Sequence, residues 1–306
     1  MMILETLFPV FALVFLGRIV KITGFAGDAF FSTSDKMVYY IFFPCMLFWK
    51  IGGSNTMATL DMGLPLAGLC AVLTIFTAST LYIILGRVPA FQAGTFSQSC
   101  YRFNTYIGMA VVLNGLGTEG VVQFSLLIGF VIPVINVLSV SVLIWFSGRQ
   151  YGFGQRCCKL VKALIANPLI LACIAGLLFS RFQTGFPAFI DKTLNLVSMI
   201  TLPLALLSIG SAFSFSNLRG YFRRSLEASI FKMVLFPFSG VFFMTLFGVG
   251  GVSFQTGLIF FSLPTSTALY VLSSQMNSDT DLAAATIVFS TLFSIVSLSA
   301  VLFLAC

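Results

Sequence analysis

The sequence predicts an all-α integral membrane protein with ten transmembrane helices. Only 8% of its 306 residues are charged, whereas 58% are hydrophobic and 36 are Phe. The mean hydropathy is +1.05. A soluble domain carries roughly a quarter of its residues as charged side chains, so this chain cannot cover its apolar bulk with a water-facing surface. Lipid is therefore the expected solvent for most of it.

Ten apolar segments of about bilayer-spanning length follow one another along the chain. They lie at residues 3–20, 37–54, 63–86, 90–113, 120–147, 163–181, 187–212, 226–248, 252–275 and 281–304. Pro44, Pro203 and Pro264 fall inside the second, seventh and ninth segments, and a polar run at 98–105 interrupts the fourth. Because proline removes a helical donor, we expect broken helices at these places, with Gly108 as a further break position. The other segments should be plain helices.

The basic residues predict the orientation. Most Lys and Arg residues lie in connections on one side of the predicted membrane, and a basic loop at 149–162 is the strongest of them. Positive residues favour the cytoplasmic side, so both termini should lie outside a plasma membrane, as in the inner membrane of a bacterium. The net charge of +7 is explained by topology and anionic lipid, and nucleic acid is not an expected partner.

An internal repeat of about 160 residues divides the chain. Five landmarks recur in nearly one register: Pro9 with Pro168, Gly17 with Gly176, Pro44 with Pro203, Asn104-Thr105 with Pro264-Thr265, and Glu119 with Asp279. The repeats would be residues 1–148 and 163–306, with five segments each. Because five is odd, the second repeat should be inverted in the membrane, which is typical of alternating-access secondary transporters.

The two central breaks predict the binding site. Main-chain groups exposed by a broken helix are costly in lipid unless protein or a wet cavity satisfies them. If the fourth and ninth helices cross near mid-membrane, their half-helix N-termini favour an anion. Asn104, Thr105, Pro264, Thr265 and Ser266 lie at this predicted crossing.

Three further polar residues fall inside spans. Arg102 is expected near the site, because charged residues within spans commonly line a pathway or pair internally. Asn136 of the fifth segment must find a partner, and both helix packing and substrate contact satisfy that need. Lys232 of the eighth segment is expected to snorkel to the inner interface.

Several function classes are excluded or unsupported. The chain has no His, so Ser-His-Asp catalysis and His-based metal sites are impossible. The nine acidic residues lie near span ends or in loops, which leaves no evident carboxylate pair at mid-membrane. We therefore expect no enzyme activity, no cofactor and no metal site.

The motifs FNTYIGMAVVLNGLGTEG at 103–120, LPLALLSIGSAFS at 202–214 and SLPTSTALYVLSSQMNSDTDLAAATIVFSTLFS at 262–294 resemble the auxin efflux carrier family, which includes the plant PIN carriers. The resemblance implies a fold like that of bile acid:sodium symporters, with helices 1, 2, 6 and 7 as scaffold and helices 3–5 and 8–10 as core. It also implies organic-anion substrates, with Asn104 and Asn136 holding the carboxylate. The chain departs from the plant carriers in having no Pro in the fourth helix.

The expected function is secondary transport of a small mono- or dicarboxylate by alternating access. A cation-coupled symporter of the bile acid type and a non-transporting receptor are the alternatives that stay open. The expected partners are the substrate anion and membrane lipid, and a homodimer is compatible with them.

Overall fold

The computed structural model describes residues 2–53, 62–146, 168–182, 185–213 and 218–305. Helices and the loops between them make up this part of the chain, and no strand occurs in it. The predicted all-α class is therefore confirmed for the described ranges. The basic loop predicted at 149–162 lies outside the described residues, as do the neighbouring ends of the two predicted repeats.

The helices follow the apolar segments closely. In the first half they are α1 (Met2–Ile22), α2 (Asp28–Met37), the π-helical η1 (Val38–Phe42), α3 (Phe43–Gly52), α4 (Gly63–Tyr82), the π-helical η3 (Ile83–Arg87), α5 (Ala90–Tyr101) and α6 (Thr105–Phe146). In the second half they are α8 (Pro168–Phe182), α9 (Ala188–Ser211), α10 (Leu218–Ile230), the π-helical η4 (Phe231–Leu235), α11 (Phe236–Leu246), α12 (Gly251–Phe261), α13 (Ala268–Gln275) and α14 (Thr280–Ala305). Gly117, with φ of 66°, divides α6 between the predicted fourth and fifth segments.

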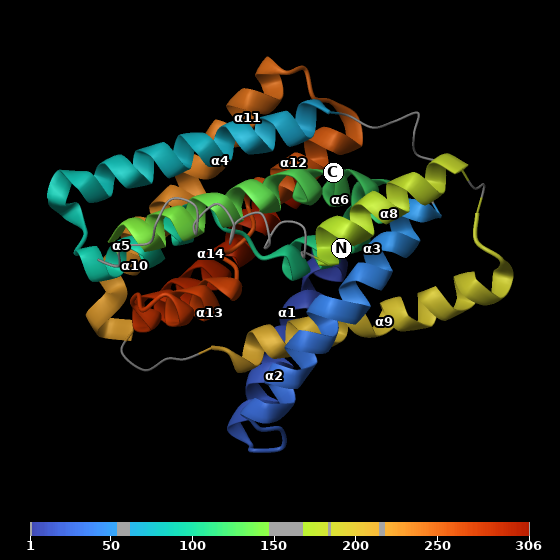
Figure 1. Cartoon of the computed structure of the whole chain (residues 1–306), viewed down its shortest axis with the longest axis horizontal. Coiled ribbons are helices and arrows are strands. Elements are labelled where there is room, and N and C mark those ends of the chain that lie inside the picture. Colours follow the sequence, from blue (N-terminus) through green and yellow to red (C-terminus); the bar gives the residue numbers. More distant parts are fainter. Residues whose placement is uncertain (1, 54–61, 147–167, 183–184, 214–217, 306) are drawn as a thin grey trace.

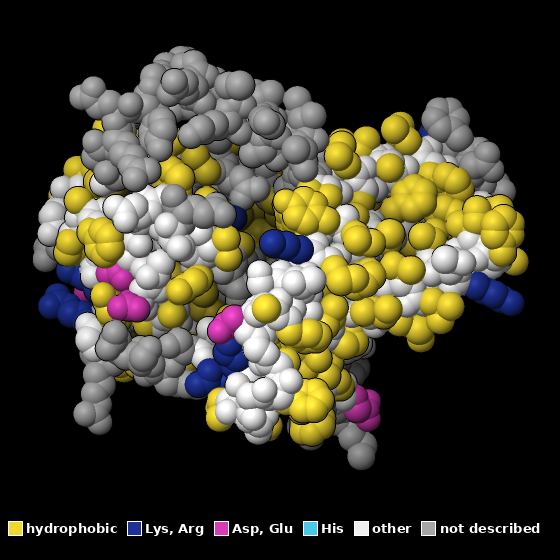
Figure 2. All heavy atoms as spheres, turned by 60° about the horizontal axis from the view of Figure 1, so that its bottom comes forward, with side chains coloured by type: hydrophobic (Ala, Val, Ile, Leu, Met, Phe, Trp, Pro, Cys, Tyr) yellow, Lys and Arg dark blue, Asp and Glu magenta, His cyan; other side chains and the backbone are white. Residues whose placement is uncertain are grey.

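The length and the apolar composition of the helices indicate a multi-pass membrane protein. In the described part of the chain, 5 helical stretches are long and apolar enough to cross a bilayer. Large apolar side chains are strongly exposed, among them Phe189 of α9 at 73% and Phe303 of α14 at 75%. Hydrophobic side chains cover much of the face shown in Figure 2, and charged ones are sparse on it. Such a surface suits lipid rather than water.

The helices pack in two groups. In the first, α1 lies against α9 and α3 lies against α8, and α2 and α3 also contact α9. Figure 1 shows α9 crossing beside α1 and α2. In the second group, α4, α5, α6 and α10 to α14 pack on one another. The first group contacts the second chiefly through α6, which touches α1, α3, α8 and α9.

Glycines allow the closest helix crossing in the first group. A Cβ at Gly17 of α1 would lie 1.9 Å from the carbonyl oxygen of Leu207 in α9. A Cβ at Gly210 of α9 would lie 1.7 Å from the carbonyl oxygen of Val14 in α1. Backbone therefore touches backbone at this crossing, as small residues permit between membrane helices.

The breaks expected at Pro44 and Pro203 are not present. Pro44 is the second residue of α3, and the chain stays helical through the π-helical turn η1 that precedes it. Pro203 lies inside α9, which runs continuously from Ala188 to Ser211. Proline lacks a backbone N–H donor, and the i→i+5 hydrogen bonds of the π-helical turn before Pro44 allow the helix to continue without it. α9 packs against α1, α2 and α3, and this packing cannot be predicted from the local sequence around Pro203.

Candidate functional site

Two helices are interrupted in the interior, at the positions that the sequence predicted. α5 ends at Tyr101 and α6 begins at Thr105, so residues 102–104 are not helical. α12 ends at Phe261 and α13 begins at Ala268, so residues 262–267 form the second interruption. We call these the first break and the second break. Gly108, expected as a break position, lies instead within the helical part of α6.

The two breaks touch through the main chain. The N–H of Asn104 donates a 2.8 Å hydrogen bond to the carbonyl oxygen of Pro264. The Thr265 hydroxyl donates to the carbonyl oxygen of Ser99 in α5 at 3.1 Å, and the Thr265 N–H donates to Ser290 Oγ of α14 at 3.1 Å. Asn104 and Thr265 are 1% and 0% exposed. Buried main-chain groups released by one break are thus satisfied partly by the other.

Asn104 also begins α6. Its Oδ1 accepts hydrogen bonds from the N–H groups of Tyr106 and Ile107, each at 3.1 Å. This is the arrangement of a helix N-cap, in which a side-chain oxygen satisfies the free donors of the first turn. An Asn placed directly before an apolar run is the sequence signal for such a cap. The amide oxygen of Asn104 is therefore already engaged by the protein.

Arg102 and Asn136, both expected at the site, contact each other. Arg102 Nη2 donates to Asn136 Oδ1 at 2.8 Å, and Nη1 donates to Gln98 Oε1 at 2.8 Å. Gln98 is fully buried, and Arg102 and Asn136 are half-buried. The sequence analysis gave Gln98 no role, although its position one turn before Arg102, at the end of α5, was the available signal.

Thr105, Ser266 and Gly108 surround the breaks. Thr105 and Ser266 are half-buried, and Ser266 Oγ accepts the N–H of Ala268 at the start of α13 at 3.2 Å. A Cβ at Gly108 would lie 2.5 Å from Leu263 Cδ1 and 2.5 Å from Phe124 Cζ. Glycine at this position lets the second break approach α6 closely.

The first helix group reaches the site through aromatic rings. Phe43, at the start of α3, packs edge-on against Tyr106 in the first turn of α6, with ring centroids 5.1 Å apart. Phe43 is fully buried. A movement between the two helix groups would therefore change the surroundings of the first break.

Lys232 does not snorkel to an interface, contrary to the sequence expectation. It is fully buried in η4, with Nζ 4.1 Å from the ring centroid of Phe236 and 6.0 Å from that of Phe103 in the first break. The π-helical turn and the aromatic packing around it direct the side chain inward. A hydropathy profile does not contain that information.

The site can offer positive charge and donors to an anion. A guanidinium has five N–H donors, and the two hydrogen bonds to Gln98 and Asn136 leave others for a ligand. The N-terminal ends of α6 and α13 add partial positive charge. In the described ranges, no three His, Cys, Asp or Glu side chains converge as a metal site would require.

Comparison with known proteins agrees with these features. Residues 153–302 match the family model described as membrane transport protein. The chain contains a membrane transport protein domain of the auxin efflux carrier family. An uncharacterized transporter of Methanothermobacter thermautotrophicus is 24% identical over 96% of this chain and 95% of its own length. An uncharacterized transporter of Methanocaldococcus jannaschii is 23% identical over 95% of each chain.

The matched domain is described as a membrane transport protein, and the two relatives, which align with this chain over 95% of their own length, are named as transporters. The resemblance drawn from the sequence motifs is therefore confirmed.

Proposed function

We propose that this protein is a secondary transporter of a small organic anion, a mono- or dicarboxylate, that works by alternating access. The observation that carries the proposal is the hydrogen-bonded contact of the two breaks beside Arg102. Interrupted helices that meet inside a membrane protein are typical of transporter binding sites. A positive side chain and two half-helix N-termini at that place favour an anion.

Two inverted five-helix repeats would build the fold. Gly17 and Gly176 are landmarks of the sequence repeat, and both sit at helix crossings. Gly17 of α1 contacts α9 next to Gly210, and a Cβ at Gly176 of α8 would lie 3.0 Å from Ile51 Cβ in α3. Ile51 precedes Gly210 by about one repeat length, so the α1–α9 and α3–α8 contacts would be equivalent under the repeat.

The helix groups supply the moving parts. α1, α2–α3, α8 and α9 would be the scaffold, and the remaining helices would be the core that carries both breaks. The contacts within each group support this division. Displacement of the core past the scaffold would expose the site to each side of the membrane in turn.

The anion would bind at Arg102, Asn136, Thr105 and the second break around Pro264, Thr265 and Ser266. Arg102 would form charge-assisted hydrogen bonds to a carboxylate, and Asn136 would hold the guanidinium in place. Asn104 would contribute mainly by positioning the N-terminus of α6, because its amide oxygen caps that helix.

Flux in proteoliposomes tests the proposal. Radiolabelled acetate, malonate, malate and indole-3-acetate would be offered to wild type, Arg102→Gln, and the matched control Arg181→Gln. Arg181 is an exposed basic residue in the last turn of α8. We expect one of these anions to enter with wild type and the control, and its rate to fall at least tenfold with Arg102→Gln. Equal rates for the two variants would contradict the site.

The same assay separates the alternatives. A carboxylate that binds the purified protein but never crosses the vesicle would identify a receptor. Uptake that requires sodium would identify a sodium symporter of the bile acid type. The proposal also includes both termini outside, a bacterial inner-membrane location and a homodimer, which protease accessibility in oriented vesicles and cross-linking would test.

A further inference from the structure

Lys232 is a buried basic residue that is not part of the proposed anion site. Its side chain is 0% exposed, and among the described residues Nζ has no hydrogen-bond partner. Nζ lies 4.1 Å from the ring centroid of Phe236. A cation–π contact stabilises an ammonium by roughly 0.5–2 kcal/mol, whereas burying an ion costs several kcal/mol. The ammonium form is therefore poorly compensated in this structure.

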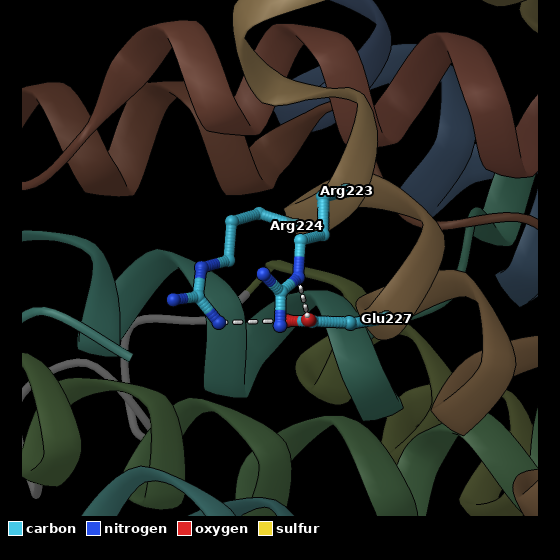
Figure 3. Close-up of polar contacts among 3 residues, drawn as sticks. All are labelled: Arg223, Arg224 and Glu227. Atoms are coloured by element: carbon cyan, nitrogen blue, oxygen red, sulfur yellow. Dashed lines mark hydrogen bonds and ion pairs between the residues drawn. The ribbon is translucent and has the colours of Figure 1, made fainter. Parts of the chain in front are cut away.

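The groups around Lys232 provide no carboxylate for it. η4 packs against α4, α5, α10, α11 and α14. Cys100 of α5 is the titratable group that acts electrostatically on Lys232 among the described residues. The acid of α10, Glu227, is paired with Arg223 and Arg224 (Figure 3). The other titratable groups on these elements are not carboxylates near Lys232 in the contacts of the described residues: Tyr82 packs on Phe96 and on Phe231 of η4, Cys70 of α4 is a half-buried thiol, Tyr101 lies near Ser139, and Asp281 interacts with Tyr221.

The first break links Lys232 to the anion site. Phe103 lies between Arg102 and Asn104, and its ring centroid is 6.0 Å from Lys232 Nζ. Phe103 also packs on Phe260 of α12, with centroids 4.6 Å apart. In surroundings of such low dielectric, an anion at the breaks would attract an ammonium at Lys232 strongly. Anion binding and protonation of Lys232 would thus stabilise each other.

Buried hydroxyl groups lie on the face of α10 that is continuous with Lys232. Ser225 and Ser229 of α10 are 0% and 3% exposed, and they precede Lys232 by two and by one helical turn. Thr286 of α14 contacts Ser225 Oγ at 3.4 Å, and Ser229 Oγ has no partner among the described residues. Hydroxyls can both donate and accept hydrogen bonds, so this face of α10 supplies small polar groups between Lys232 and the part of the helix that carries Arg223.

We propose that Lys232 is the proton-binding group that couples anion transport to proton transport. One proton from the aqueous phase binds the lone pair of the neutral amine when the anion occupies the breaks. It leaves to the opposite aqueous phase when the anion is released, so no bond other than N–H forms or breaks. This inference rests on the proposed function, and it adds one proton to each transported anion.

Flux under an imposed pH gradient tests the coupling. Proteoliposomes with the membrane potential clamped at zero would take up labelled malonate, or the best-carried anion of the panel above, with and without an inside-alkaline gradient of one unit. One proton per anion permits accumulation up to about tenfold for such a gradient. We expect accumulation with wild type and with the control Lys192→Met, and none with Lys232→Met. Protein-free vesicles correct for leakage of the protonated acid.

Methionine suits this position, because replacing a buried charge by an apolar side chain of similar volume is often tolerated. Flux of wild type that is unaffected by the gradient, or a Lys232→Met variant that still responds, would overturn the proposal. Complete absence of carboxylate flux in wild type would instead refute the proposed function. A second measurement is independent of substrate: in ¹⁵N-lysine NMR at pH 7, the Lys232 signal, identified by its loss in Lys232→Met, should be that of a neutral amine. An ammonium signal without anion would also overturn the inference.

Discussion

The N–H of Asn104 and the carbonyl oxygen of Pro264 replace the helical partners that each has lost. In a continuous helix, the Pro264 carbonyl would accept from the N–H of Ala268. That N–H instead donates to Ser266 Oγ at 3.2 Å, and the carbonyl accepts from Asn104 at 2.8 Å. Because lipid offers no partner for such groups, each break is stable in the presence of the other. This mutual satisfaction explains how two interrupted helices persist inside a membrane protein.

The Thr265 hydroxyl strengthens this contact, so its removal should lower the stability of the protein. Thr265→Val keeps the shape but loses the 3.1 Å hydrogen bond to the buried carbonyl of Ser99. We expect a loss of about 1–2 kcal/mol, measured as a lower thermal unfolding temperature in detergent. Thr265→Ser retains the hydroxyl and should stay closer to wild type. Valine and serine variants of equal stability would show that this hydrogen bond contributes nothing.

Asn104 variants separate the helix cap from the anion site. Asn104→Ala removes the cap on Tyr106 and Ile107 and should cost about 1 kcal/mol of stability. Asn104→Asp keeps an oxygen acceptor at the start of α6, where a negative charge is favourable. The aspartate variant should therefore keep the unfolding temperature of wild type. Its negative charge should repel a carboxylate, so its malonate flux should fall. Malonate flux through Asn104→Asp equal to that of wild type would show that the anion binds elsewhere.

Gly108 should tolerate no side chain. A Cβ there would meet Leu263 and Phe124 at 2.5 Å, and both neighbours are fully buried. Overpacking of this kind costs about 1–3 kcal/mol, so Gly108→Ala should unfold at a lower temperature. Gly115→Ala on the same helix is the control, because its nearest neighbours lie at 3.5 Å. Similar unfolding temperatures for the two variants would show that the second break does not press on α6.

The α1–α9 crossing should be still less tolerant. At Gly210 a Cβ would lie 1.7 Å from the main-chain oxygen of Val14, and backbone cannot rotate away as a side chain can. Gly210→Ala should reduce the yield of folded, monodisperse protein in size-exclusion chromatography more than Gly108→Ala does. Gly220→Ala in α10 is the control, because nothing lies within 4 Å of its added Cβ. Normal yields for Gly210→Ala would contradict the close contact of these helices.

Composition and local polarity predicted much of the fold and part of the site. Apolar runs identified the helices, and the polar residues around Asn104 and Pro264 identified the two breaks, because interruption of a helix is a local property of the chain. Proline alone misled at Pro203, where the helix continues through it. Whether proline breaks a membrane helix depends on neighbouring helices, and these are not local.

The side-chain pairings needed the structure. The sequence indicates Arg102 and Asn136 separately, as polar residues inside predicted spans. Their 2.8 Å contact with each other depends on how α5 and α6 pack together. Lys232 was expected at the interface and is buried beside Phe236, because the π-helical η4 changes the direction of the side chain. Gln98 was seen only as part of a polar run, although it holds the guanidinium of Arg102.

An experimental structure of the protein with a bound carboxylate tests the central claim most directly. Malonate, or whichever acid of the panel is transported fastest, would be added at saturating concentration. We predict that its carboxylate lies within hydrogen-bond distance of Arg102 and next to the contact between Asn104 and Pro264. A bound acid distant from both residues, or helices that run unbroken through these two positions, would contradict the account.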